Sequence, residues 1–335
     1  MTSMSVRHVG TTSTRNDMIE VYKMDEFLAL ELEEVPSLLG DSLIVPQGRV
    51  IIYGAPGTYK SFATMHLCYA LSGADEWLGY DIKENIPTLY LQAEIVPRMM
   101  QERAGKVRDN FGTNDNLHYA YIRDFTLAGE ASWQEVVDVV NDTGAEFIFF
   151  DPMSNILSGS ELDDGAVRNF LKNLDRLTVA TGAGVGLVHH ARKENFNRDG
   201  STNFAGADDL RGHSSINGWA DTIIRLRRPR NVAGVIEMTW EKVRHAQEPT
   251  DKWLRFDNES GILKLSEADP IVLLTQLLQD GPKHRDIVDQ MLIKQAGLGE
   301  RRALQTRLKL EADEIIEMYK DPVDKRRMMV RLKEK

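Results

Sequence analysis

The stretch that most restricts what this chain can fold into is GAPGTYKS at residues 54–61. The apolar run VIIY at 50–53 leads into it, and residues 62–71 follow with a pattern compatible with a helix. A strand, a glycine-bearing turn, Lys-Ser and a helix form the context of a phosphate-binding loop. The glycines of such a loop let backbone N–H groups point at an anion, and the positive end of the helix dipole adds to the attraction.

The residue types in this stretch indicate the ligand. In such a loop the lysine reaches the β- and γ-phosphates of a nucleotide, and the Ser61 hydroxyl binds magnesium. Tyr59 stands where the motif has its second glycine, which bears on the curvature of the loop. An ordinary glycine turn between strand and helix is the alternative. We expect ATP and Mg²⁺ as cofactors, with the nucleotide held by Gly54, Ala55, Pro56, Gly57, Thr58, Tyr59, Lys60, Ser61 and Phe62.

Composition sets the broad class of protein. The 335 residues are enough for one large domain and a small one. No apolar stretch is long enough to cross a bilayer, and the polar residues 1–23 lack the apolar segment of a secretory signal. A single cysteine, Cys68, excludes an internal disulfide and suits a reducing compartment. These features predict a soluble cytoplasmic protein without a membrane partner.

Charge is distributed unevenly along the chain. The net charge of −10 argues against a uniformly basic nucleic-acid binder. Residues 281–335, however, hold 14 Lys/Arg against 10 Asp/Glu, so this end carries +4 and the remainder −14. A basic end on an acidic body predicts that any nucleic-acid contact made through charge is concentrated there.

Hydrophobic patterns alternate between the strand and helix types, which predicts an α/β fold with a mainly parallel sheet covered by helices. The expected strands are 50–53, 88–92, 117–122, 147–150, 185–188, 222–226, 235–240 and 253–256. The expected helices are 24–32, 62–71, 97–111, 133–141, a long one capped by Asp163-Asp164, and 214–220. The stretch 192–209 has no usable periodicity, and a loop of this length inside a domain is usually functional.

Several strand ends carry side chains suited to phosphoryl transfer. Asp151 follows four apolar residues in the Walker B form and would hold magnesium directly or through water. Glu94 follows the strand after the P-loop helix, where it would act as general base on the attacking water. His189 and His190 end another strand, and one of them would hydrogen-bond the γ-phosphate. The sequence does not say which histidine faces the ligand.

These motifs, taken in order, resemble the RecA-type ATPase core, and most closely the ring-forming helicases of the DnaB and plasmid RepA types. The resemblance covers roughly residues 36–265. No counterpart of the primase-binding domain of DnaB precedes the core, which favours the shorter RepA-like form. The matching segments are 54–61, Glu94, Asp151, His190, DLRGHSS at 209–215, ADTII at 220–224 and Lys242-Val243-Arg244.

The resemblance implies a homo-oligomer, expected to be a hexameric ring, that encloses single-stranded DNA. In the family the arginine of Lys-x-Arg reaches into the ATP site of the neighbouring subunit, so Lys242 and Arg244 are expected catalytic residues beside Lys60, Glu94 and His190. The 192–209 loop corresponds to a DNA-binding loop of the channel, and a solvated loop of mixed charge is the alternative. Its expected phosphate contacts, with a neighbouring arginine, are Lys193, Arg198 and Arg211.

The C-terminal end has the pattern of a winged helix–turn–helix. Helices are expected at 271–278, 287–295 and 300–312, followed by a basic hairpin whose turn spans 321–327. In the third helix Leu304, Leu308 and Ala312 are spaced to pack inward. A helical protein-docking module is the alternative. The residues expected to face DNA are Arg301, Arg302, Gln305, Lys309 and Arg326.

The sequence therefore predicts an arm with a short helix at 1–35, a RecA-like ATPase core at 36–266 and a winged helix–turn–helix domain at 270–335. The expected function is an ATP-driven ring motor on DNA, of the replicative helicase type. A recombination or annealing ATPase that forms filaments, and an ATP-switched DNA-binding regulator without unwinding activity, remain open.

Overall fold

The computed structural model describes residues 21–32, 34–123, 125–191, 214–228, 234–266, 269–296 and 298–333. The chain forms two compact units, Met1–Pro36 and Ser37–Lys335. In its described part the first unit has a helix, α1 (Met24–Leu28), which is shorter than the helix expected over 24–32. Residues 1–20 of the expected polar arm, and the 192–209 loop, lie outside the described residues.

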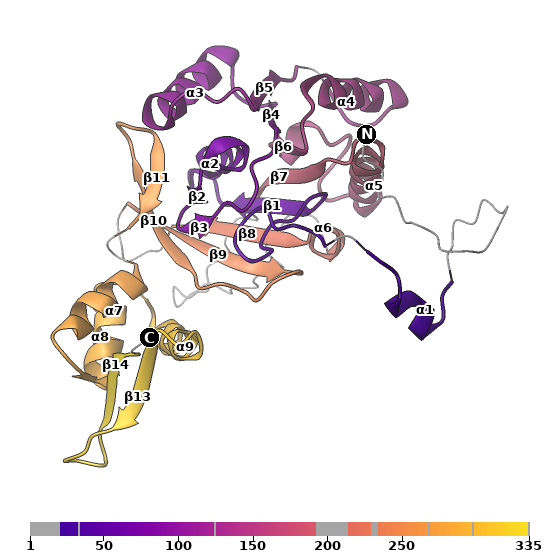
Figure 1. Ribbon diagram of the computed structural model, residues 1–335. Helices are drawn as coiled ribbons and strands as arrows, with labels where there is room; N and C mark the ends of the chain where they lie inside the picture. The colour runs from indigo at the N-terminus through magenta and orange to yellow at the C-terminus, as the bar shows by residue number, and fades with distance from the viewer. Residues whose placement is uncertain are drawn as a thin grey trace. The chain divides into compact units, whose positions relative to one another are not determined.

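The described residues of the second unit form a nine-stranded sheet in the order β11-β10-β9-β8-β1-β7-β6-β4-β5 (Figure 1). The strands from β8 to β5 in this order run parallel, and β9, β10 and β11 run antiparallel to their neighbours. Their bounds are β1 (Arg49–Gly54), β4 (Thr88–Gln92), β5 (Leu117–Tyr121), β6 (Phe147–Asp151), β7 (Gly184–His190), β8 (Thr222–Arg227), β9 (Val235–Val243), β10 (Lys252–Asp257) and β11 (Ile262–Leu265).

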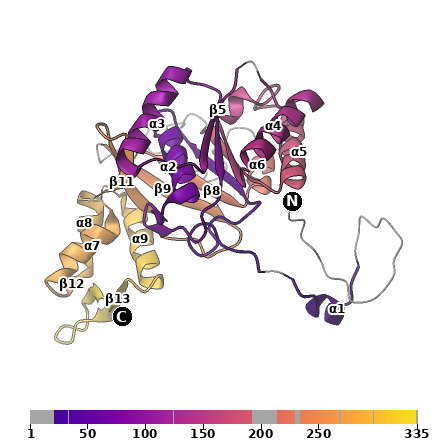
Figure 2. The same ribbon diagram turned by 45° about the horizontal axis from the view of Figure 1, so that its top comes forward.

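Helices cover both faces of this sheet (Figure 2). On one face, α2 (Lys60–Gly73) and α3 (Pro97–Phe111) bury their apolar side chains against the strands. On the other, α4 (Glu130–Thr143), α5 (Asp164–Thr181) and α6 (Ser214–Trp219) do so. This confirms the expected α/β class, a mainly parallel sheet covered by helices.

Most expected elements of the core are present. The strand at 88–92 and the helix at 97–111 have the expected bounds, and Asp163 caps α5 by accepting hydrogen bonds from two backbone N–H groups. Strand β11 and the small hairpin of β2 (Glu76–Trp77) and β3 (Tyr80–Asp81) were not expected.

Two glycines of β7 make room for the phenyl rings of β6. The rings of Phe147 and Phe149 stack with their centroids 5.0 Å apart. A Cβ on Gly186 would lie 2.1 Å from the Phe149 ring, and one on Gly184 would lie 2.4 Å from the Phe147 ring. Any side chain at these glycines would displace the rings that support the end of β6, where Asp151 stands.

The C-terminal part of the second unit contains helices and a small antiparallel sheet in the order β12-β14-β13. Its hydrophobic cluster includes Leu274, Leu292 and Val330, and also Val235 and Trp253 of the large sheet. The elements are α7 (Pro270–Gln279), β12 (Lys283–His284), α8 (Arg285–Lys294), α9 (Glu300–Ala312), β13 (Ile316–Lys320) and β14 (Met328–Leu332).

The inward face predicted for α9 is wrong. Leu304 and Leu308 are 45% and 48% exposed, and Ala312 is exposed as well. The buried positions are instead Ala303, Arg307 and Leu310. The helix turns this way because the Arg307 guanidinium, only 4% exposed as a residue, donates to Asp289 of α8 at 2.7 Å, so a paired arginine takes a place the pattern gave to leucine.

Every helix in the described ranges is too short or too polar to span a lipid bilayer.

Candidate nucleotide site

The loop from Gly54 to Ser61 joins the end of β1 to the start of α2 (Figure 1). A Cβ on Gly54 would lie 2.2 Å from the carbonyl oxygen of Leu226 on β8, so only glycine fits there. Tyr59 has a φ of 63° and a ψ of 28°, the left-handed conformation that glycine adopts easily and other residues adopt at a cost of about 1–2 kcal/mol. The loop therefore keeps a left-handed residue at the position of the missing glycine.

The Lys60 ammonium is buried at the base of this loop. It donates to the carbonyl oxygens of Gly54 at 2.9 Å and Ala55 at 3.1 Å. Burial lowers the pKa of Lys60, while the nearby carboxylates of Asp151 and Glu94 oppose the shift. The lysine charge thus faces the two carboxylates predicted to serve the same reaction.

Asp151 and Ser61 lie in hydrogen-bond contact, as a shared magnesium site requires. Burial raises the pKa of Asp151, and hydrogen bonds from the hydroxyls of Tyr90 and Ser61 oppose the rise. Tyr90 donates to the carboxylate at 2.5 Å. Carboxylate and hydroxyl oxygens are the donors that Mg²⁺ prefers, and the ion commonly takes one or two carboxylates together with substrate phosphates. The two residues fit the metal.

Glu94 lies two residues beyond β4, with its side chain exposed. Its backbone N–H donates to the Gln92 side-chain oxygen at 2.7 Å, and the Gln92 amide donates to the Tyr90 hydroxyl at 3.2 Å. Gln92 therefore ties the turn that carries Glu94 to the tyrosine that holds Asp151. Neither Tyr90 nor Gln92 was singled out from the sequence, although both alternate on β4 toward the same face as Asp151.

The register of β7 separates the two histidines. His189 pairs in register with Tyr53 and His190 with Gly54, so His190 lies beside the first residue of the loop. Side chains alternate along a strand, and in register His190 shares the face of Asp151. His189 is 1% exposed and lies on the opposite face, 3.5 Å from a Glu161 oxygen.

Lys242 lies near the C-terminal end of β9, and Arg244 follows that strand. Val243 pairs in register with Thr222, which in turn pairs with Val50 at the start of β1. Lys242 donates to the carbonyl oxygen of Asn217 at 2.5 Å. Arg244 pairs with Asp221 at 2.8 Å and donates to the carbonyl oxygen of Gly218 at 3.1 Å, so both cations sit at the C-terminal end of α6.

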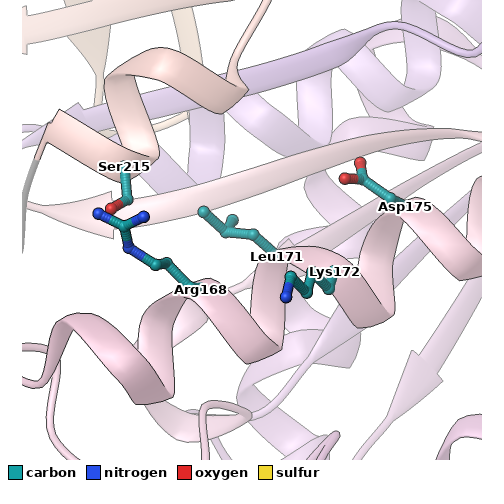
Figure 3. A pocket seen from close by; sticks show the side chains of 5 residues that line it. All are labelled: Arg168, Leu171, Lys172, Asp175 and Ser215. Atoms are coloured by element: carbon teal, nitrogen blue, oxygen red, sulfur yellow. The ribbon is translucent and has the colours of Figure 1, made fainter.

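A hollow of about 410 Å³ lies between α5 and α6, on the face of the sheet opposite α2 (Figure 3). Arg168 points toward Ser215 across it. Ser215 donates to Asp164 at 2.6 Å, and Asp175 accepts from Trp219 at 2.8 Å. These contacts hold α6 against α5. Because Arg244 donates to a carbonyl oxygen of α6, they also help to fix the position of Arg244. The hollow is distant from the loop chemistry.

The residues expected to contact DNA have different surroundings. Lys193, Arg198 and Arg211 lie outside the described residues. Arg301 and Gln305 are exposed on α9, and Arg326 is exposed in the β13–β14 turn.

Two of the residues expected to face DNA make contacts within the chain. Arg302 pairs with the buried Glu237 and, at 3.1 Å, with Asp251. Lys309 donates to the carbonyl oxygen of Pro249 at 2.6 Å and lies 3.4 Å from Glu248. Both cations join α9 to the large sheet and its loops. They face the chain itself because α9 is rotated from the register that the leucines suggested.

Residues 15–195, more than half of the chain, match the protein family described as the AAA domain. Among solved structures, the chain is similar to a KaiC-like protein from the hyperthermophilic archaeon Pyrococcus horikoshii OT3. The identity is 14% and the TM-score 0.48, over 67% of this chain and 91% of that chain. No curated protein sequence matches this chain.

Proposed function

The chain belongs to the AAA domain family, and on this premise we propose that it is an ATP-driven motor that forms rings on DNA, of the replicative helicase type. The family and the P-loop make it a P-loop ATPase. A motor function on DNA goes beyond this ATPase assignment. The proposal for it rests on the ordered motifs of the sequence and on the position of Arg244.

One observation carries the ATPase chemistry. Ser61, Lys60 and Asp151 meet at the junction of the loop, α2 and β6, with Glu94 close enough to act on the pKa of Lys60. Phosphoryl transfer requires a phosphate cradle, a cation, a metal and a positioned water. These four residues meet those needs with side chains that the fold already holds together.

Each residue then has a separate task. Loop N–H groups and the Lys60 ammonium bind the β- and γ-phosphates, with Lys60 exchanging the carbonyls of Gly54 and Ala55 for phosphate oxygens. Ser61 and Asp151 would hold Mg²⁺, which neutralises charge on the phosphates when bound. Glu94 accepts the proton of the attacking water, and Gln92 fixes the turn on which Glu94 stands. His190, which pairs in register with Gly54, is proposed to contact the γ-phosphate.

The position of Arg244 supports a site shared between subunits. It lies alongside the start of β1, whereas the loop begins at the end of that strand. Four residues of strand separate the two, roughly 13 Å. Arg244 of one subunit therefore serves the phosphates of a neighbour, and Lys242 accompanies it, as the RecA-type resemblance implies.

The C-terminal helices and hairpin are proposed to be a winged helix that contacts DNA. With Arg302 and Lys309 engaged inside the chain, the contacting set becomes Arg301, Gln305 and Arg326, all of which are exposed. The predicted channel contacts Lys193, Arg198 and Arg211 complete the proposed DNA path.

The test compares wild type, Lys60→Ala and the surface control Lys172→Ala in ATP hydrolysis and in the unwinding of a forked duplex. We expect wild type and control to hydrolyse ATP, with stimulation by single-stranded DNA, and to unwind the duplex. In Lys60→Ala we expect both activities to fall by roughly two to three orders of magnitude, the effect of losing a group that stabilises transition-state charge. Normal hydrolysis in Lys60→Ala would remove the P-loop assignment. Hydrolysis with strand annealing and no unwinding would favour the recombination-type ATPase, and a sequence-specific footprint without unwinding would favour the regulator.

A further inference from the structure

Tyr59, the residue that departs from the P-loop motif, is part of a stack of flat groups at the mouth of the loop. Its ring lies on that of Phe256 from β10, with centroids 4.0 Å apart and planes within 14°. The Arg228 guanidinium lies over Tyr59, 5.3 Å from the ring centroid. Phe62, in the first turn of α2, lies 4.7 Å from Phe256.

The stacking of Tyr59 on Phe256 counteracts a backbone strain that a glycine at position 59 would not have. Tyr59 is held in the left-handed conformation, which strains any residue with a side chain. The ring contact with Phe256 offsets this strain, since stacked aromatic pairs stabilise a fold beyond the area that they bury. A plain core contact would bury the ring, yet Tyr59, Phe62 and Phe256 are all only half-buried. The stack therefore faces the solvent at the nucleotide site.

The two faces of the Tyr59 ring differ in what covers them. Phe256 backs one face in close parallel contact. Within the described ranges, the Arg228 guanidinium is the further group recorded over the ring; this side chain is exposed, and its guanidinium also comes within 3.6 Å of the position a Cβ would take on Gly57. Tyrosine rings and guanidinium planes both stack on nucleic-acid bases. A nucleotide with its phosphates in the loop carries its base only one ribose away.

We propose that Tyr59, backed by Phe256, is the base-stacking residue of the nucleotide site, and that the base inserts between the Tyr59 ring and the Arg228 guanidinium. The inference rests on the proposed function, because it takes the loop as the phosphate site. It makes Tyr59 a determinant of specificity: the site distinguishes a nucleoside triphosphate from a bare triphosphate through this ring.

The experiment measures equilibrium binding of ATP and of inorganic tripolyphosphate, both with Mg²⁺, to wild type, Tyr59→Gly, Tyr59→Phe and Phe256→Leu. Tyr59→Gly restores the regular motif and relieves the strain, so the variant is expected to fold. We expect it to lower ATP affinity roughly 5- to 100-fold, the worth of one base stacked on an aromatic ring. Tripolyphosphate affinity should be unchanged, Tyr59→Phe should behave as wild type, and Phe256→Leu should lower ATP affinity alone.

The ratio of ATP affinity to tripolyphosphate affinity decides the outcome. A change in how the loop binds phosphates alters both affinities and therefore cancels in their ratio. If Tyr59→Gly keeps the wild-type ratio or shifts it in favour of ATP, Tyr59 is not the stacking residue. If wild type binds ATP and tripolyphosphate equally well, the base contributes nothing to binding. This inference then fails, while the ATPase proposal stands. If wild type binds neither, both fail together.

Discussion

At the scale of single residues, the surroundings of two carboxylates give them different tasks. Asp151 is 1% exposed, and hydroxyl donors on Tyr90 and Ser61 hold its oxygens. Glu94 is exposed, and its backbone N–H donates to Gln92. A carboxylate held by hydroxyls suits a metal, whereas an exposed carboxylate near Lys60 suits a water molecule and its proton.

We predict that Glu94→Gln binds ATP with near wild-type affinity but hydrolyses it roughly 10²- to 10⁴-fold more slowly, because the amide cannot accept the proton of the water. Single-turnover hydrolysis and equilibrium ATP binding measure the two effects separately. Glu102→Gln, an exposed glutamate of α3, is the matched control. Normal hydrolysis in Glu94→Gln would show that another group is the base.

The residues found from sequence were those fixed by local spacing. Lys60 and Ser61 follow directly from the order of the loop, and Asp151 from the apolar run before it. The residues that were missed act across long separations: Tyr90 reaches Asp151 over 61 positions, and Phe256 reaches Tyr59 over almost two hundred. Nothing in the spacing of one sequence signals such contacts, because the sheet order that creates them is not local.

At the scale of elements, α9 shows how an ion pair can override a hydrophobic pattern. Leucines at 304 and 308 predict one rotation, and the Arg307–Asp289 and Arg302–Asp251 pairs set another. The second rotation places Arg302 beside Asp251, in a region that also holds the buried Glu237. This cluster joins the C-terminal elements to the start of β9.

The Asp251 carboxyl makes that junction sensitive to pH. Burial and the Glu237 charge raise the pKa of Asp251 from 3.8 to about 6, against the opposing charges of Arg302 and Lys309. The folded chain then holds a proton that the unfolded chain releases near pH 4. The stability from this proton is complete below about pH 4 and is lost as the pH rises through 6, by about 3 kcal/mol at most.

We therefore predict that Asp251→Asn, which does not ionise, gains stability relative to wild type as the pH is raised from 4 to 7. Urea unfolding at several pH values gives the difference in unfolding free energy between the two proteins. The exposed Asp115→Asn is the control, and its difference from wild type should stay flat. Parallel curves for Asp251→Asn and wild type would contradict the prediction.

Elements with strong periodicity or clear caps were predicted well. The strand at 88–92 has the pattern of a buried strand, with Leu-Tyr-Leu at its centre, and the helix at 97–111 opens on a proline, so both were placed at their bounds. The hairpin of β2 and β3 has strands of two residues each, too short for any period to register. Strand β11 depends on pairing with β10, which is a tertiary contact.

At the scale of the whole molecule, the loop follows the C-terminal end of β1, whereas Arg244 lies near the level of its N-terminal end. We predict that Arg244→Ala binds ATP normally but loses hydrolysis, since an arginine supplied in trans is worth roughly 10³- to 10⁵-fold in rate. Mixing Arg244→Ala with Lys60→Ala, whose phosphate loop is inactive but whose Arg244 is intact, should restore partial ATPase activity. Neither variant alone should show it.

Co-assembly must be verified by light scattering on the same mixtures. Each variant alone, at the same total protein concentration as the mixture, provides the baseline. No recovery in mixtures that do co-assemble would place the arginine elsewhere, and Arg211 would be the next residue to replace.

The antiparallel return of β9 along β8 has a consequence for how this protein behaves when dilute. Because β9 runs back toward the start of β1, Arg244 lies beside the opposite end of that strand from the loop, and in the proposed ring it serves the loop of a neighbouring subunit. Turnover per subunit should then rise with protein concentration and fall to the background rate below the dissociation constant of the assembly. A subunit that is not in a ring would bind ATP and keep it intact, so that hydrolysis is confined to assembled particles without any separate inhibitor.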